Sequence, residues 1–144
     1  MSILDEMKVR RLYCDGGMGS LLQAAGLAAG ELPERWNISH PEVITDVHRK
    51  YLAAGAEIMT TNTFGANRLK YDKDGELKAI VEAAVANARK AADQIVSEAI
   101  ATRDELMDEA KKEAEKCLAA VQAEVDAKLA DGKRKYIAVQ DEMN

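Results

Sequence analysis

The stretch from Glu76 to Ala130 contains neither glycine nor proline and is rich in alanine, glutamate and lysine. These three residues have high helix propensity, whereas glycine and proline are the residues that most often end a helix. The sequence therefore predicts a single long helix here. At 1.5 Å per residue it would measure about 80 Å, which is much longer than the helix of a compact βα unit.

Charge separates this helix from the rest of the chain. The whole chain has a net charge of −5, and acidic residues outnumber basic ones between Ser97 and Asp131. Asp108 with Lys112, and Glu124 with Lys128, have the spacing of stabilising helix pairs. The segment is interpreted either as a solvated helix or as a binding surface for a specific partner.

The chain as a whole is acidic and has no long apolar stretch. These two features argue against nucleic acid and membranes as partners, and they predict a cytoplasmic protein.

Large apolar residues continue along the helix beyond Ser97, although they become sparse. The best-spaced ones are Leu118, Val121, Val125 and Leu129. This spacing indicates the seam of a coiled coil, through which the chain would associate with itself or with a partner. Lys111 and Lys128 interrupt the neighbouring positions, so the heptad pattern is weak.

Residues 1–71 follow a different pattern, in which short apolar runs alternate with turn residues. Residues 9–15 and 56–67 are predicted strands, because they are short apolar runs ending in polar or turn residues. Residues 18–30 and 39–55 are predicted helices, because apolar residues recur at helical spacing and a glycine closes each segment. This order of elements is typical of an α/β protein.

The sequence after the long helix predicts a third strand. Gly132 is expected to end the helix, and Lys135–Val139 is a short β-prone run. The predicted fold class is therefore α/β, with two or three parallel strands, flanking helices and one long, charged, alanine-rich helix. The expected domains are 1–92 with the βα units, 93–131 with the long helix, and 132–144 with the third strand and tail.

Three blocks of residues carry a specific resemblance. They are Asp-Gly-Gly-Met-Gly at 15–19, Pro-Glu-x-Trp-Asn at 33–37, and Thr-Thr-Asn-Thr-Phe-Gly-Ala-Asn at 60–67. In this order and spacing they resemble the amino-terminal segment of the homocysteine S-methyltransferase domain, the family of cobalamin-dependent methionine synthase and betaine–homocysteine methyltransferase. A fainter likeness covers 131–139. The resemblance implies part of a (βα)8 barrel, the TIM barrel, with a substrate site at the carboxyl ends of its strands.

The same resemblance implies which residues bind the substrate homocysteine. They are Asp15, Gly16, Gly17, Thr61, Asn62 and Thr63. Asp15 and Gly16 would hold the amino-acid end of homocysteine, with Asp15 facing its ammonium group, and the Thr-Asn-Thr segment would line the site by hydrogen bonding. Taken alone, Asp-Gly-Gly also fits an ordinary tight turn, and Thr-Asn-Thr also fits a polar turn that ends a strand.

For the complete family enzyme, the resemblance implies a zinc ion held by three cysteines, with cobalamin or folate in some members. The metal would lower the pKa of the homocysteine thiol for methyl transfer in methionine synthesis. This chain contains only Cys14 and Cys117, and it lacks the Gly-x-x-Cys and Gly-Gly-Cys-Cys blocks of the family. We therefore expect no metal or cofactor to be bound by this chain alone. We interpret it as a truncated methyltransferase that is inactive alone, so enzymatic activity stays an open question.

Other residues suggest less chemistry. Cys14 is interpreted as a core residue, and both cysteines as reduced thiols. His40 and His48 are interpreted as structural or exposed rather than as metal ligands, because no partner is spaced for zinc.

Besides the truncated methyltransferase, the sequence allows two other functions. The chain could be an interaction or assembly protein that uses the long helix, or a binder of small amino acids. The protein partner would be a second copy or the missing part of the barrel.

Overall fold

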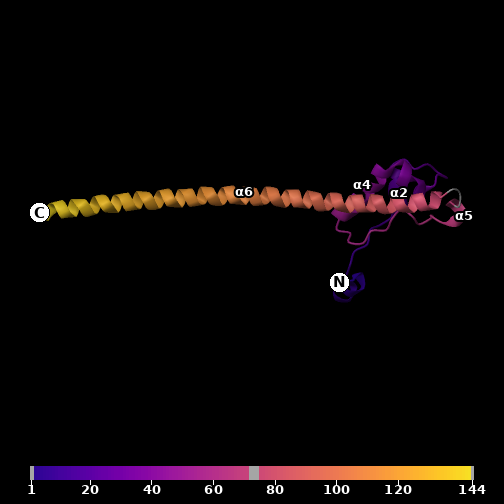
Figure 1. Ribbon diagram of the computed structural model, residues 1–144, viewed down its shortest axis with the longest axis horizontal. Coiled ribbons are helices and arrows are strands. Elements are labelled where there is room, and N and C mark those ends of the chain that lie inside the picture. Colours follow the sequence, from indigo (N-terminus) through magenta and orange to yellow (C-terminus); the bar gives the residue numbers. More distant parts are fainter. Residues whose placement is uncertain (1, 72–74, 144) are drawn as a thin grey trace. The chain divides into compact units, whose positions relative to one another are not determined.

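The computed structural model describes residues 2–71 and 75–143, which form helices joined by loops (Figure 1). In chain order the helices are α1 (Ile3–Val9), α2 (Met18–Ala24), the 3₁₀ helix η1 (Pro33–Arg35), α3 (Trp36–Ser39), α4 (Pro41–Ala53), α5 (Arg68–Tyr71) and α6 (Glu76–Glu142). The chain divides into two units, Met1–Ala99 and Ile100–Asn144.

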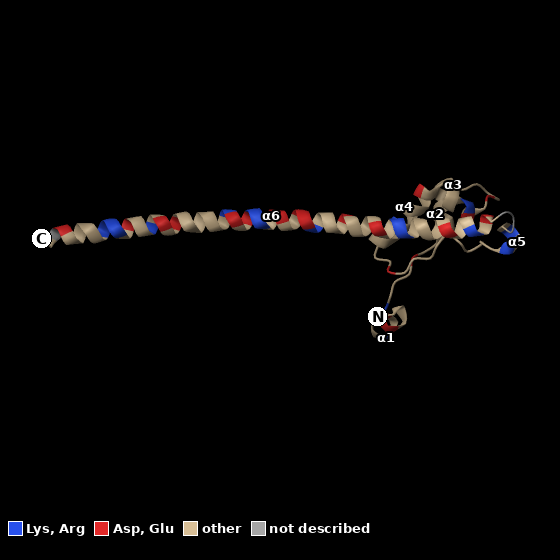
Figure 2. Ribbon diagram, viewed as in Figure 1, with Lys and Arg blue, Asp and Glu red and all other residues tan. Residues whose placement is uncertain are grey.

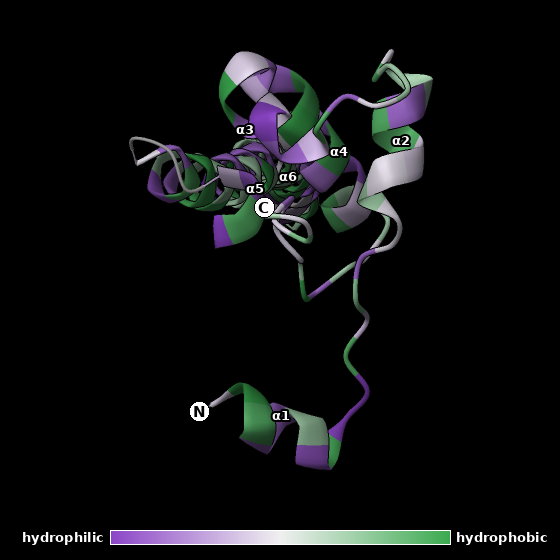
Figure 3. Cartoon of the chain, turned by 90° about the vertical axis from the view of Figure 1, so that its right-hand side faces the viewer, coloured by the Kyte–Doolittle hydropathy of each residue, from purple (hydrophilic) through white to green (hydrophobic). Residues whose placement is uncertain are grey.

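The core of the first unit joins α2, α3 and α4. Its buried cluster comprises Leu22, Trp36, Ile44 and Val47. Ile44 and Val47 are three residues apart on α4, so their side chains project from the same face. Figure 3 shows that α2 and α4 carry both hydrophobic and hydrophilic residues, as expected for helices with one buried face. The core therefore forms by helix packing and needs no sheet.

The amino-terminal part of α6 belongs to the same unit. Ile80, Ala84 and Ala91 are fully buried, and their spacing of four and seven residues places them on one face of the helix. Asn87 lies on the same face and donates a hydrogen bond to the backbone carbonyl of Asn37 over 2.9 Å. The predicted long helix is thus present, and its first turns help to build the core.

The prediction of an α/β partial TIM barrel is wrong, because the described residues contain no strand. The first two predicted strands form a single isolated parallel β-bridge, between Cys14 and Ile58. The next donor of a parallel ladder would be the backbone N–H of Thr60, which instead binds the carboxylate of Asp15 over 2.9 Å. The ladder therefore stops after one bridge. A pair of strands with no further neighbours is also marginally stable.

The predicted third strand is wrong as well. Lys135–Val139 is helical, because α6 continues through Gly132. A glycine inside a helix costs about 1 kcal/mol relative to alanine. One side-chain ion pair spans this position and offsets part of that cost, because Asp131 binds Lys135 over 2.8 Å. The described residues also offer this segment no strand with which it could pair.

The second unit consists of the rest of α6. Every described side chain from Ile100 to Met143 is exposed except that of Asp131, which is half-buried. Figure 2 shows acidic and basic residues interspersed along the helix. The unit has no second helix among its described residues, so it does not show the coiled coil expected from the sequence. No helix in the described ranges has both the length and the apolar character needed to cross a membrane.

Candidate functional site

A cleft of about 740 Å³ lies where the loop before α2 meets η1 and the loop after α4. Its walls come from three segments that are far apart in the sequence, and each segment contains one of the three blocks. The lining residues are Gly16, Met18, Gly19, Pro33, Glu34, Met59, Thr60, Thr61, Asn62, Thr63 and Phe64. The fold therefore brings the three blocks together around one cleft.

The predicted site residues fall into two groups. Gly16, Thr61, Asn62 and Thr63 line the cleft, whereas Asp15 and Gly17 are not among the lining residues. The hydroxyl groups of Thr61 and Thr63 lie 2.9 Å apart. Because one of these hydroxyls donates to the other, the pair can still donate one proton to a ligand. The Thr-Asn-Thr segment thus presents a hydrogen-bond donor in the cleft.

Asp15 connects the first segment to the second. Its carboxylate accepts hydrogen bonds from the backbone N–H and from the hydroxyl of Thr60, both over 2.9 Å. Thr60 lines the cleft, so Asp15 holds part of the wall in place. Each carboxylate oxygen can accept a further hydrogen bond.

The glycines after Asp15 are held by α4. The hydroxyl of Tyr51 donates to the backbone carbonyl of Gly17 over 3.2 Å. A Cβ atom at position 16 would lie 2.8 Å from the same hydroxyl, which is closer than a real Cβ contact. Position 16 therefore favours glycine, because a methyl group there would force the side chain of Tyr51 to shift.

Asn62 joins the second and third blocks. Its side-chain amide donates to the backbone carbonyl of Pro33, and its own backbone carbonyl accepts from the side chain of Asn37, both over 2.8 Å. Asn62 is only 6% exposed although it lines the cleft. Its amide group is therefore used mainly to fasten the two loops together.

Glu34 is the acidic side chain among the lining residues, and it is 4% exposed. Its two carboxylate oxygens accept from the backbone N–H of Gly65 over 2.6 Å and from the hydroxyl of Tyr71 over 2.7 Å. Burial raises the pKa of Glu34, but these hydrogen bonds and the charge of Lys70 outweigh burial, so its pKa lies below the ordinary value. Glu34 is therefore a buried, ionised carboxylate in the cleft wall.

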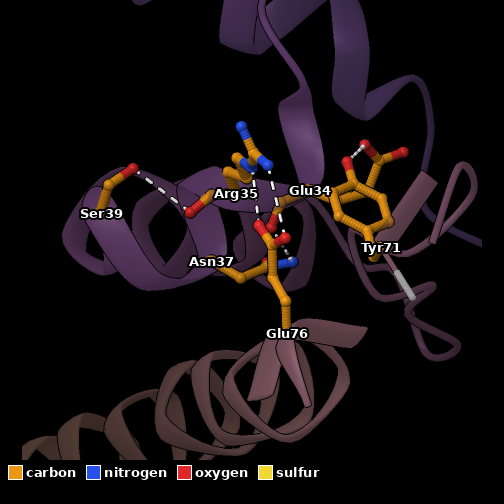
Figure 4. Close-up of polar contacts among 6 residues, drawn as sticks. All are labelled: Glu34, Arg35, Asn37, Ser39, Tyr71 and Glu76. Atoms are coloured by element: carbon orange, nitrogen blue, oxygen red, sulfur yellow. Dashed lines mark hydrogen bonds and ion pairs between the residues drawn. The ribbon is translucent and has the colours of Figure 1, made fainter. Parts of the chain in front are cut away.

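Figure 4 shows how the neighbours of Glu34 are arranged. Tyr71 points its hydroxyl at the carboxylate, and burial together with this hydrogen bond raises the pKa of Tyr71 well above its usual value. The guanidinium of Arg35 lies 5.9 Å from the centre of the Tyr71 ring and binds Glu76 over 2.7 Å. The charge of Arg35 is thus paired with Glu76, at the start of α6, rather than with Glu34.

His48 is fully buried on α4, and neither ring nitrogen has a hydrogen-bond partner. Burial lowers the pKa of His48, and the negative charge of Asp15 opposes this change only in part. The ring is therefore neutral at pH 7. His40 is half-buried and stacks on Trp36 with ring centres 4.2 Å apart. Both histidines have structural settings, as the sequence suggested.

Within residues 2–71 and 75–143, no three His, Cys, Asp or Glu side chains are grouped so that they could hold a metal ion. Cys14 and Cys117 are both free and exposed. The interpretation of Cys14 as a core residue is thus wrong, since no sheet forms to cover it. The residues present do not fit the zinc centre that the resemblance implies for the complete enzyme.

Sequence reasoning missed three residues of the site. Glu34 and Thr60 stand inside the quoted blocks but were not predicted to act, and Tyr51 stands outside them. Tyr51 follows His48 by three residues on α4, so its position on the inner face could have been found from helical spacing. The partners of Glu34 lie far away in the sequence and left no local signal.

Comparison with known proteins gives the same family for most of the chain. The family model for homocysteine S-methyltransferase matches residues 12–140. Methionine synthase of Mycobacterium tuberculosis is 35% identical over 104 residues, which are 66% of this chain and 9% of that protein. Methionine synthase of Mycobacterium leprae is 31% identical over a stretch of the same length and coverage.

A solved structure is also similar. It is the homocysteine methyltransferase MmuM from Escherichia coli in its metallated form, with 26% identity and a TM-score of 0.57. The likeness covers 65% of this chain and 35% of that one. The chain thus spans only part of the length of each relative. Because the family model covers nearly all of the sequence, the chain belongs to the homocysteine S-methyltransferase family.

Proposed function

We propose that this chain supplies the part of a homocysteine S-methyltransferase that binds the amino-acid end of homocysteine. The observation that carries the proposal is that one cleft is lined by residues of all three family blocks. The proposed binding residues are Asp15, Gly16, Gly17, Thr61, Asn62 and Thr63. Loops joined by a rigid helical core are a common place for such a site.

The geometry suggests what each part of the site does. Gly16 offers bare backbone at the cleft, and the Thr61–Thr63 pair can donate a hydrogen bond to the ligand carboxylate. Asp15 and Gly17 flank Gly16 and are fastened to Thr60 and Tyr51. The loop is therefore positioned before a ligand arrives, which lowers the entropic cost of binding.

We expect binding without methyl transfer by this chain alone. Transfer requires the thiol of homocysteine to lose its proton, so that a bond from sulfur to the methyl carbon forms while the bond to the donor breaks. The described residues that line the cleft include no histidine and no cysteine, and no three His, Cys, Asp or Glu side chains in the described ranges are grouped to hold a metal ion. The cleft therefore supports recognition of the amino acid better than activation of its sulfur.

The test is calorimetric titration of the full chain with homocysteine, with serine as the comparison ligand. We expect saturable heat with homocysteine, and weaker binding in the double variant Thr61→Val, Thr63→Val. The control is Ser97→Ala on α6, which removes a hydroxyl that does not line the cleft, so this variant should bind homocysteine as the wild type does. Absence of heat at millimolar homocysteine would overturn the proposal. Methyl transfer by the chain with zinc and a methyl donor would overturn the expectation of inactivity.

A second candidate function is self-association through the second unit. Positions spaced three or four residues apart form a stripe along one face of α6. Apart from Arg103, the residues of this stripe are uncharged. They are Ile100, Met107, Ala110, Ala114, Leu118, Val121, Val125, Leu129, Gly132, Tyr136, Val139 and Met143. Its large side chains are about half exposed or more, for example 70% for Leu118. Packing this stripe against a second copy would remove apolar surface from water.

Sedimentation equilibrium over a wide range of concentrations tests this candidate. We expect a dimer that Leu118→Glu with Val125→Glu converts to a monomer. The control is the double variant Lys116→Glu, Lys128→Glu, which also places two glutamates on α6. Because these two positions lie beside the stripe and not in it, the control variant should leave the dimer largely intact. A wild-type chain that stays monomeric at high concentration would rule out self-association. Homocysteine binding is measured separately, so the two candidates are judged independently.

A further inference from the structure

We infer that the second unit of α6 pairs with the same segment of a second copy in antiparallel orientation, centred on Leu118. This inference rests on the second candidate function, self-association through this unit, and it adds the direction and the register of the partner helix. The spacing of the stripe, the sizes of its side chains and the distribution of charge along the helix all favour this arrangement.

The stripe keeps to one face of a straight helix. It repeats every 11 residues, so that Met107, Leu118 and Leu129 occupy equivalent positions. Such a repeat corresponds to about 3.67 residues per turn, which is close to the 3.6 of an ordinary α-helix. The stripe therefore drifts only slowly around the helix, and a second straight helix can follow it over its whole length.

The side chains of the stripe are complementary in size about Leu118. In an antiparallel pair centred there, each residue faces the residue that lies equally far on the other side of the centre. The facing pairs are Ala114 with Val121, Ala110 with Val125, Met107 with Leu129, and Arg103 with Gly132. Each small residue thus meets a larger one, as in a well-packed core. In a parallel pair in register, alanine would meet alanine and Arg103 would meet Arg103.

Gly132 leaves space for the side chain of Arg103 from the second copy. A shallow hollow of about 470 Å³ lies on this part of α6, and its lining residues are Lys128, Leu129, Gly132, Lys133, Tyr136 and Ile137. The long apolar stem of an arginine can lie in such a hollow. The guanidinium of Arg103 binds Asp104 over 2.7 Å, so it would approach the two lysines together with its own counter-charge.

Charge along the second unit selects the same orientation. Residues 104–126 are mainly acidic, whereas a short segment near the carboxyl end is mainly basic (Figure 2). The bases of this segment are Lys128, Lys133, Arg134 and Lys135, with Asp131 as the acid among them. An antiparallel pair places the basic segment of each copy beside the acidic residues 104–108 of the other, whereas a parallel pair places it beside itself. Such complementarity acts mainly on the choice of partner and register.

The experiment is disulfide crosslinking of the full chain. Cys14→Ser with Cys117→Ser removes the native thiols, both of which are exposed. In this background, Ala110→Cys and Val125→Cys are made as two separate proteins. The two new cysteines face each other in the antiparallel pair, but two copies of the same variant hold their cysteines about 22 Å apart. That separation is far beyond the reach of a disulfide.

We expect the mixture of the two variants to form crosslinked dimers roughly ten times faster than either variant alone. Fast crosslinking of each variant with itself would show a parallel pair. A dimer in sedimentation without crosslinking of the mixture would show another register. Either result overturns the inference but leaves self-association standing. A wild-type chain that stays monomeric at high concentration overturns both.

Ala123→Cys in the same background is the matched control. It lies two residues before Val125 and therefore on the opposite face of α6, away from the stripe. Mixed with Ala110→Cys, it should crosslink no faster than the single variants do. A rate equal to that of the Ala110→Cys and Val125→Cys mixture would show that the cysteines meet by random collision, and this would overturn the inference too.

Discussion

Gly65 donates its backbone N–H to the carboxylate of Glu34 over 2.6 Å, and this contact joins the loop after α4 to η1. A Cβ atom at position 65 would overlap the same carboxylate oxygen and would also meet the amino group of Lys70. The glycine of the third block is therefore explained by the glutamate of the second. The two blocks are complementary parts of one loop contact.

Gly65→Ala should destabilise the first unit by about 1 to 3 kcal/mol, because the added methyl group has no space beside a buried carboxylate. Urea unfolding followed by Trp36 fluorescence measures this, since Trp36 is the single tryptophan and lies in the core. Gly19→Ala is the matched control, because a Cβ atom there meets nothing within 4 Å. Equal stability of the two variants would contradict the prediction.

Tyr71→Phe should lower the free energy of unfolding by about 1 to 3 kcal/mol at pH 7, because a buried carboxylate loses a hydrogen bond. The pKa of Glu34 is lowered in the folded chain, so its contribution to stability is present above its ordinary pKa and is lost as the pH falls toward the folded value. The difference between wild type and variant should therefore shrink in acid. Tyr13→Phe changes an exposed tyrosine and should cost almost nothing.

Gly16→Ala should also destabilise the chain, because its Cβ atom would lie 2.8 Å from the hydroxyl of Tyr51. Tyr51→Phe removes that oxygen and, with it, the hydrogen bond to Gly17. The double variant Gly16→Ala, Tyr51→Phe should therefore lose less stability than the sum of the losses in the two single variants. Strict additivity in this double-mutant cycle would show that the two residues do not interact.

The free energy of unfolding should fall as the pH drops below about 6.5, the ordinary pKa of histidine. Burial lowers the pKa of His48 in the folded chain, so below that pH the unfolded chain binds more protons than the folded one. His48→Leu should remove this dependence, whereas His40→Gln should keep it. Unfolding curves between pH 7.5 and pH 5 measure the slopes. The same slope in wild type and His48→Leu would exclude this explanation.

The sequence by itself determined the family and the helices α2, α4 and most of α6. Helical hydrogen bonds join residues four apart, so the absence of glycine and proline after Glu76 was enough to predict most of α6. The spacing of Ile44 and Val47 likewise predicted a helix where α4 lies. The three blocks were sufficient to suggest the family because their order and spacing can be read directly from the chain.

Only the tertiary structure decided whether strands form and which residues face the cleft. A strand needs hydrogen bonds from residues that are distant in sequence, and Thr60 gives its N–H to the side chain of Asp15, 45 residues away, instead of to a ladder. The contact between Gly65 and Glu34 joins residues 31 apart. Local patterns carry no record of such partners, so the strands were predicted wrongly and Glu34 was overlooked.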